Sequence, residues 1–325
     1  MSTRVPVATR SVSLADLGAL LFLGAVWGGA FLAFRIASPE VGPVWAAEAR
    51  IGLAAIAMSA LFGRRAWATF RHRLGAIAFT GAAFAAIPFA LIAFAALTLP
   101  TAFGALLNAS TPLFTAMVGA VALGQRLSGR VIAGIAVGMT AVLILVGWSP
   151  LPLGPDTLLA VAAAIGAAFS YAIAGTFVRR KLPDVGGVEL ATGQLVAASI
   201  VLLPVAVLSG APGTPSPTGL VALVGVALVS TALAWPVFFR VLSHTTPTAA
   251  STVTFIVPAF GMLWGAIALG EPVGPELLAG AGLILGSLVL ELGLPVGAWM
   301  RGGVARAGRT LGSVRGALAV RGSAA

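Results

Sequence analysis

The chain has 325 residues, of which 59% are hydrophobic and only 9% are charged. Soluble domains carry about 25% charged residues, so this composition excludes a soluble protein. The net charge of +10 would also suit a nucleic-acid-binding protein, but the basic residues lie in the gaps between apolar runs, a pattern that orients a membrane protein instead.

Ten apolar segments of helical length are predicted to cross a membrane. They cover residues 14–36, 43–62, 74–97, 101–123, 130–148, 157–178, 188–208, 218–240, 248–270 and 276–294. The first is too long for the core of a signal peptide, so we expect it to remain as a span. Residues 1–13 are predicted to form a cytoplasmic segment, and residues 295–325 a basic, disordered cytoplasmic tail.

The arginines predict the orientation of these spans. All but two of the 19 basic residues fall in segments that share one side of the membrane when the spans are counted. Cytoplasmic loops of membrane proteins carry an excess of Lys and Arg, so both termini are expected in the cytoplasm. The protein is expected to be a multi-pass protein of the cytoplasmic membrane. The predicted outer loops contain only acidic charges: Glu40, Asp156, Glu271 and Glu276.

Two stretches of the chain, residues 100–129 and 247–274, are similar to each other. Both begin with Pro-Thr-Ala, contain an inner proline and reach Ala-Leu-Gly at Gly124 or Gly270, and from Pro112 and Pro258 onward the offset is constant at 146. At an offset of 144, Trp27 matches Tyr171 and Arg50 matches Gln194. We therefore expect a duplicated unit, with a first repeat over 14–148 and a second over 157–294. Because five is an odd number of spans, the predicted fold is an all-α integral membrane protein of ten transmembrane helices in two inverted five-helix repeats.

These motifs together resemble the EamA-type members of the drug/metabolite transporter superfamily. The features that match are Trp27-Gly28 in a first span ending in Arg, Pro43 followed by Arg50, and proline-centred fourth and ninth spans that end in Gly-Gln-Arg or Gly-Glu-Pro. The resemblance covers residues 14–294 and implies a central substrate cavity and transport of amino acids, nucleosides or other small metabolites. One departure is Gln125, where the family usually has Glu.

Arg50 is the first candidate for function. An arginine within a span costs about 2.5–3.5 kcal/mol on insertion scales, so it should face the bundle interior or water. It either meets an anionic group of a solute in a cavity or pairs structurally with a helix end or Glu48.

Glu48 is the carboxylate clearly inside a predicted span and is the candidate for proton coupling. Alternatively, Glu48 has a structural role or is simply hydrated. Glu48 and Arg50 lie about 200° apart around a helix and cannot both face one narrow cavity.

Aromatic and uncharged polar residues deep in the spans are further candidates for substrate binding, with helix packing as the alternative. They are Trp27, Asn108, Tyr171, Gln194, Trp235 and Trp264.

Prolines within spans are candidate hinges, or they only shape the packing of the helices. The paired ones are Pro88, Pro112, Pro236 and Pro258. Arg35 is interpreted first as an interfacial anchor, and second as a gating partner of Glu40 or Glu271.

The leading hypothesis is a secondary transporter that moves a small metabolite, amino-acid-like or otherwise amphipathic, by alternating access, with export favoured. An enzyme is not expected, because the spans lack histidine, cysteine, paired aspartates and a nucleophile elbow. A non-transporting scaffold or sensor is the other alternative.

No catalytic residue, metal site or cofactor is predicted. The expected partners are the lipid bilayer, a small-molecule substrate and, through the Gly134-xxx-Gly138 and Gly282-xxx-Gly286 faces, a second protomer; nucleic acid is not expected.

Overall fold

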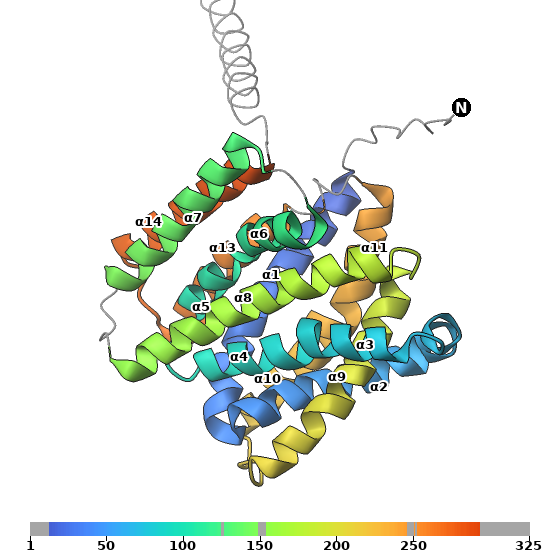
Figure 1. Cartoon of the computed structure of the whole chain (residues 1–325). Coiled ribbons are helices and arrows are strands. Elements are labelled where there is room, and N and C mark those ends of the chain that lie inside the picture. Colours follow the sequence, from blue (N-terminus) through green and yellow to red (C-terminus); the bar gives the residue numbers. More distant parts are fainter. Residues whose placement is uncertain (1–12, 125–126, 149–153, 246–249, 251, 293–325) are drawn as a thin grey trace, which may run out of the picture.

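The computed structural model describes residues 13–124, 127–148, 154–245, 250 and 252–292, and in that part every regular element is a helix (Figure 1). The predicted cytoplasmic segment up to residue 12, Gln125 and the predicted tail 295–325 lie outside the described residues. The first half contains α1 (Leu14–Val41), α2 (Pro43–Phe70), α3 (Leu74–Gly81), η1 (Ala82–Ala86), α4 (Ile87–Ala95), α5 (Thr101–Asn108), α6 (Thr111–Leu123) and α7 (Gly129–Gly147). The second half contains α8 (Pro155–Lys181), α9 (Gly187–Leu208), α10 (Pro217–Ala227), η2 (Leu228–Leu233), α11 (Ala234–His244), α13 (Val253–Leu269) and α14 (Pro275–Leu292).

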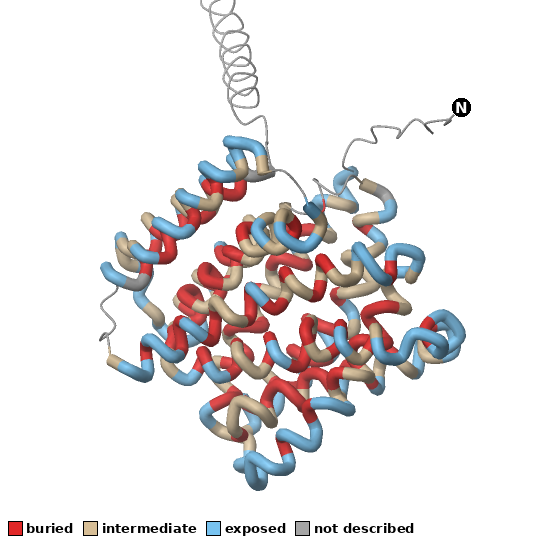
Figure 2. Tube along the Cα trace, in the orientation of Figure 1, coloured by how far each residue is buried: buried red, intermediate tan, exposed pale blue. Residues whose placement is uncertain are grey.

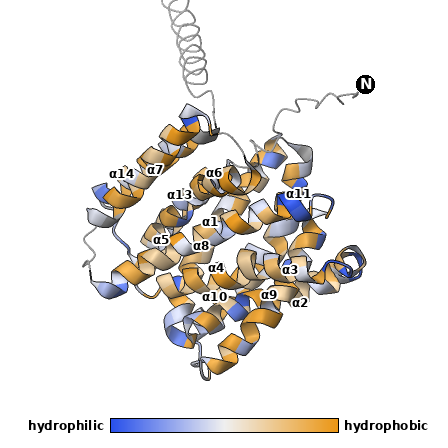
Figure 3. Ribbon diagram, viewed as in Figure 1, coloured by the Kyte–Doolittle hydropathy of each residue, from blue (hydrophilic) through white to orange (hydrophobic). Residues whose placement is uncertain are grey.

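Seven helical stretches among the described residues are long and apolar enough to cross a membrane, and three shorter apolar helices accompany them. The outer faces of these helices are hydrophobic: Val121 is 89% exposed and Leu143 is 71% exposed. Buried positions line the inside of the bundle, and apolar residues extend over its outer surface (Figures 2 and 3). An exposed apolar surface of this extent suits lipid rather than water as the surrounding solvent.

Two helices are longer than the apolar runs that predicted them. α1 continues to Val41 and α2 continues to Phe70, so Arg64 and Arg65 lie on α2 and not in a loop. Hydropathy marks where an apolar segment ends, whereas backbone hydrogen bonding continues through polar residues that favour a helix. The turn between the two helices is a single residue, Gly42, whose φ of 86° is accessible to glycine at little cost.

Equivalent helices of the two halves lie side by side. The Glu48 end of α2 contacts Ser199 of α9, and the Phe70 end packs its ring against Gly193, so these two helices run antiparallel. In the same way α7 and α14 lie together at one edge of the bundle (Figure 1), with Gly138 against Ser287 and Leu145 against Gly280. Gly138 therefore packs within the chain, whereas Gly282 and Gly286 have open space where a side chain would stand.

The third helix of each half is interrupted by one turn of π-helix followed by a proline. η1 precedes Pro88, and η2 precedes Pro236. In a π register the nitrogen of Pro88 would bond the carbonyl of Ala83, but proline has no N–H. The hydroxyl of Ser170 on α8 donates to that carbonyl instead, at 2.7 Å. The interruption in the first half therefore leaves a backbone carbonyl that the first helix of the other half bonds.

Candidate functional site

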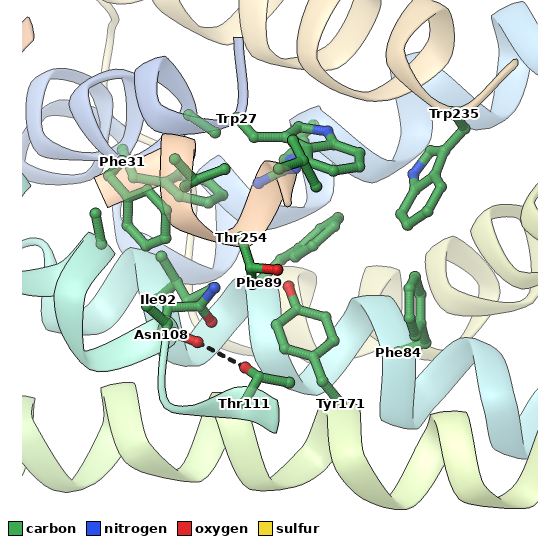
Figure 4. A pocket seen from close by; sticks show the side chains of 17 residues that line it. Trp27, Phe31, Phe84, Phe89, Ile92, Asn108, Thr111, Tyr171, Trp235 and Thr254 are labelled. Carbon is green, nitrogen blue, oxygen red and sulfur yellow. Dashed lines mark hydrogen bonds between the residues drawn. The ribbon is translucent and has the colours of Figure 1, made fainter. Parts of the chain in front are cut away.

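A cavity of about 290 Å³ lies between the two halves of the chain (Figure 4). The first half contributes side chains from α1, α2, η1 and α4 and from the interrupted segment of α5 and α6. The second half contributes side chains from α8, α11 and α13. The lining residues are Trp27, Ala30, Phe31, Phe34, Arg50, Phe84, Phe89, Ile92, Ala105, Asn108, Ala109, Thr111, Tyr171, Trp235, Val253, Thr254 and Val257. Volumes of about 300–1,000 Å³ are typical of small-molecule sites, so this cavity suits a small solute.

Aromatic rings form much of the cavity wall. The ring centroids of Trp27 and Trp235 lie 5.5 Å apart, those of Phe84 and Trp235 lie 5.3 Å apart, and those of Phe84 and Tyr171 lie 5.4 Å apart. Figure 4 shows Trp27 and Trp235 on one side of the cavity and Phe84 and Tyr171 across from them. Trp27 and Tyr171, the residues matched by the internal repeat, thus face the same space from opposite halves.

Among the described residues that line the cavity, Arg50 is the one that carries a charge, and it is 6% exposed. Its Nε donates to Thr231 Oγ1 on η2 at 3.0 Å, and Thr231 Oγ1 in turn donates to the carbonyl of Val226 at 2.8 Å. The guanidinium carbon lies 3.7 Å from the ring centroid of Phe89 and 5.4 Å from that of Phe34. Cation–π contacts of this kind offset part of the cost of burying the charge.

No acidic side chain pairs with Arg50 within the part of the chain that the structure describes. Its predicted alternative partner, Glu48, instead accepts a hydrogen bond from Ser199 at the contact between α2 and α9, and its Oε2 is buried without a hydrogen-bond partner. Glu48 does not line the cavity. The two residues occupy different faces of α2, as their spacing of two positions predicts.

The first helix of each half holds the π turn of the other. Trp27 Nε1 donates to the carbonyl of Ser230 on η2 at 3.0 Å, and the Ser230 hydroxyl donates back to the carbonyl of Val26 at 2.6 Å. The Ser170 bond to Ala83 is the corresponding contact in the other direction. These bonds fix Trp27 and the π turns that carry Phe84 and Thr231, so the cavity wall is held from both halves.

Two of the residues predicted to bind substrate lie outside the cavity. Gln194 is buried on α9, where its backbone carbonyl lies against Gly81 of α3. Trp264 stacks on Phe260 and donates to the carbonyl of Ala25 at 2.9 Å. Both residues were predicted to bind substrate from their depth in a span and their place in the repeat. Neither property indicates which face of a helix points toward the cavity.

Several lining residues were not predicted. Phe31 and Phe34 follow Trp27 at helical spacing, so the four positions 27, 30, 31 and 34 form one stripe of α1. That stripe is readable in the sequence. Phe84 and Phe89 had no comparable signal, because the π turn changes which face of the helix meets the cavity. Thr254, near the start of α13, had none either.

Asn108 is the remaining predicted residue in the lining. It is the last residue of α5, just before the helix is interrupted at Ala109 and Ser110, and its Oδ1 is buried without a hydrogen-bond partner. Pro112 begins α6 directly after the interruption, whereas its repeat partner Pro258 lies inside the continuous helix α13.

Polar links join the two halves near the helix ends. Arg35 bonds the carbonyls of Ala96 and Leu97 at 2.8 and 2.9 Å, and its Nε lies 3.9 Å from Glu271. Arg35 therefore bonds the end of a helix and pairs with Glu271, one of the two acids predicted as its alternative partners. It is not only an interfacial anchor.

A second pair of links occupies equivalent places in the two halves. Glu40 accepts from the backbone N and Oγ of Ser216, which precedes α10, at 2.9 and 2.8 Å. Its repeat partner Asp184 forms a bidentate pair with Arg73, which precedes α3, at 2.7 and 2.8 Å. The hydrogen bonds from Arg73 lower the pKa of the Asp184 carboxyl below its usual range.

A helical bundle with an apolar outer surface and an internal cavity shared by two related halves defines a multi-pass membrane protein with a solute-sized site. The chain belongs to the EamA-like transporter family, whose model matches residues 16–147 and 158–292, once in each half. It is therefore a membrane transporter of the drug/metabolite type, with the two-repeat architecture of that family. No curated protein matches the chain significantly. Among solved structures, one titled only "Crystal structure of protein" superimposes with a TM-score of 0.63 at 16% identity, over 85% of this chain and 96% of that one. At that identity the likeness concerns the fold alone.

Proposed function

We propose that this protein is a secondary transporter that exports a small amphipathic metabolite from the cytoplasm through the cavity between its two halves. The observation that carries the proposal is the cavity itself, which both repeats line and which contains Arg50, Tyr171 and the two tryptophans Trp27 and Trp235. A midplane site at the interface of two repeats is the arrangement that secondary transporters use.

The proposed architecture is ten spans in two inverted repeats, with both termini in the cytoplasm. The antiparallel packing of α2 with α9 and of α7 with α14 supports it, because an axis in the membrane plane relates such pairs. We further propose that the halves rock against each other in alternating access, with the π turns and the prolines that follow them as flexible points. Glu48, at the contact between the halves, is the proposed site of proton coupling.

Transport by purified protein in liposomes tests the proposal. Labelled metabolites are supplied as a panel, with and without a pH gradient, and their flux is compared with that of empty liposomes. Saturable flux of at least one small solute is expected. Single introduced cysteines test the orientation without background, because the chain has none of its own. A cysteine at position 271 should react with an impermeant reagent added outside, and one at position 125 should not; the reverse result would overturn the orientation.

A further inference from the structure

We propose that the cavity selects an organic monoanion, a carboxylate attached to a flat apolar body, in preference to a zwitterion or a cation. This inference rests on the proposed transport function and specifies the solute. It follows from three properties of the cavity lining: its one charge, the absence of an acid among the described lining residues, and the arrangement of its rings.

The charge of Arg50 is not neutralised in the structure. Its side chain contacts the hydroxyl of Thr231 and the faces of Phe34 and Phe89 and interacts electrostatically with Tyr171, and none of these groups is an acidic residue. Only Nε is engaged in a hydrogen bond, so Nη1 and Nη2 keep their donors without an acceptor among the described residues. A buried cation with unused donors favours a bound anion, and the planar fork of arginine matches a carboxylate in a bidentate geometry.

A second positive charge would be disfavoured in the same cavity. None of the described lining residues is an aspartate or a glutamate, so an ammonium group would have no anionic partner there. Asn108 lines the cavity with an uncharged amide, and its buried Oδ1 has no hydrogen-bond partner. Glu48 is engaged at the contact between α2 and α9. Among the described lining residues, Arg50 is therefore the charged group that a solute meets, and its charge favours an anion.

The rest of the solute meets aromatic walls. Trp27, Phe84, Tyr171 and Trp235 present a set of rings whose centroids are 5.3 to 5.5 Å from their neighbours in the set. The indole N–H of Trp27 is already bonded to Ser230, so this residue offers its ring and not a donor. A flat apolar group stacks well on such walls, and a volume of about 290 Å³ admits one ring with a short acidic arm.

Four probes with the same ring and arm test the charge directly: 3-phenylpropionate, phenylalanine, 3-phenylpropylamine and 3-phenylpropionamide. Binding is measured by the shift of melting temperature in detergent, and flux is measured in liposomes. We expect 3-phenylpropionate to bind at least tenfold more tightly than each of the other three. In Arg50→Gln, which keeps a donor for Thr231, that preference should be lost, and an undiminished preference for 3-phenylpropionate in this variant would overturn the role of Arg50. Arg50→Lys, with a charge but no planar fork, should keep part of the preference.

The outcomes separate the two proposals. If phenylalanine or the amine binds or moves as well as 3-phenylpropionate, the preference for a monoanion is wrong and transport stands. If 3-phenylpropionate binds selectively but no solute crosses the membrane, transport is wrong and the ligand class stands. Failure of all four probes to bind wild-type protein overturns the ligand class, whatever the behaviour of the Arg50 variants.

Discussion

The carboxylate of Glu271, at the start of the connection to α14, accepts hydrogen bonds from the backbone nitrogen of Thr101 at 2.9 and 3.0 Å and from its hydroxyl at 3.1 Å. It thereby caps the N-terminus of α5 from the other half of the chain. Arg35, 3.9 Å from the same carboxylate, bonds the carbonyls that follow α4. One acid thus holds together the ends of α1, α4 and α5.

Replacing Glu271 should therefore destabilise the contact between the halves. We expect Glu271→Ala to lower the free energy of unfolding by about 1.5–3 kcal/mol, the usual value of hydrogen bonds to a charged group. Glu276→Ala is the control, because Glu276 lies in the first turn of α14 and its loss should cost less than about 1 kcal/mol. Denaturation in mixed detergent micelles measures both. Equal losses in the two variants would show that Glu271 does not link the halves.

Trp27 and Trp264 form a matched pair for testing the cavity. Each indole donates to a backbone carbonyl, at 3.0 and 2.9 Å, but only Trp27 lines the cavity. Replacing either by Phe leaves a carbonyl without its donor and should cost about 1–3 kcal/mol of stability. We expect only Trp27→Phe to change the half-saturation concentration for transport in liposomes. An equal change in Trp264→Phe would place the solute elsewhere.

Glu48→Gln tests the proposed proton coupling. The buried Oε2 of Glu48 has no partner, so it can take up a proton without breaking the bond from Ser199. We expect Glu48→Gln to abolish the stimulation of flux by a pH gradient. Ser199→Ala removes the same hydrogen bond but keeps the carboxyl, and it should retain the stimulation. Full pH dependence in Glu48→Gln would assign Glu48 a structural role.

The pair of Arg73 and Asp184 should stabilise the fold in a pH-dependent way. Because Arg73 lowers the pKa of Asp184, the contribution of the pair is present at neutral pH and is lost as the pH falls through that lowered pKa. Arg73→Ala should thus lower the melting temperature at neutral pH, and the difference from wild type should vanish in acid. In an Asp184→Asn background, the same substitution should have little effect at any pH.

The apolar runs and the repeat predicted much of the fold, because lipid contact and duplication are properties of composition and order. Among the described residues, seven helical stretches are long and apolar enough to cross a membrane, and three shorter apolar helices overlap the other predicted segments. The π turns were not predictable: neither Pro88 nor Pro236 specifies by itself whether a helix kinks, ends or changes register.

The site was predicted in part for a related reason. Trp27 and Tyr171, which the repeat matches, line the same cavity, since both lie on the first helix of a half. The residue that the repeat matches with Arg50 lies elsewhere: Arg50 reaches η2 and lines the cavity, whereas Gln194 is buried where α9 meets α3. Rotation of a helix about its axis depends on tertiary packing, which depth in a span does not encode.

Each π turn contains one residue more than regular α-helical winding would need, and this surplus sets the rotation of everything that follows it in η1–α4 and η2–α11. Deleting one residue from η2 would turn α11 by about 100°, which would carry Trp235 away from the other rings while its side chain stayed the same. If the cavity carries the solute as proposed, a single-codon deletion in η2 should change solute choice although every lining residue stays the same.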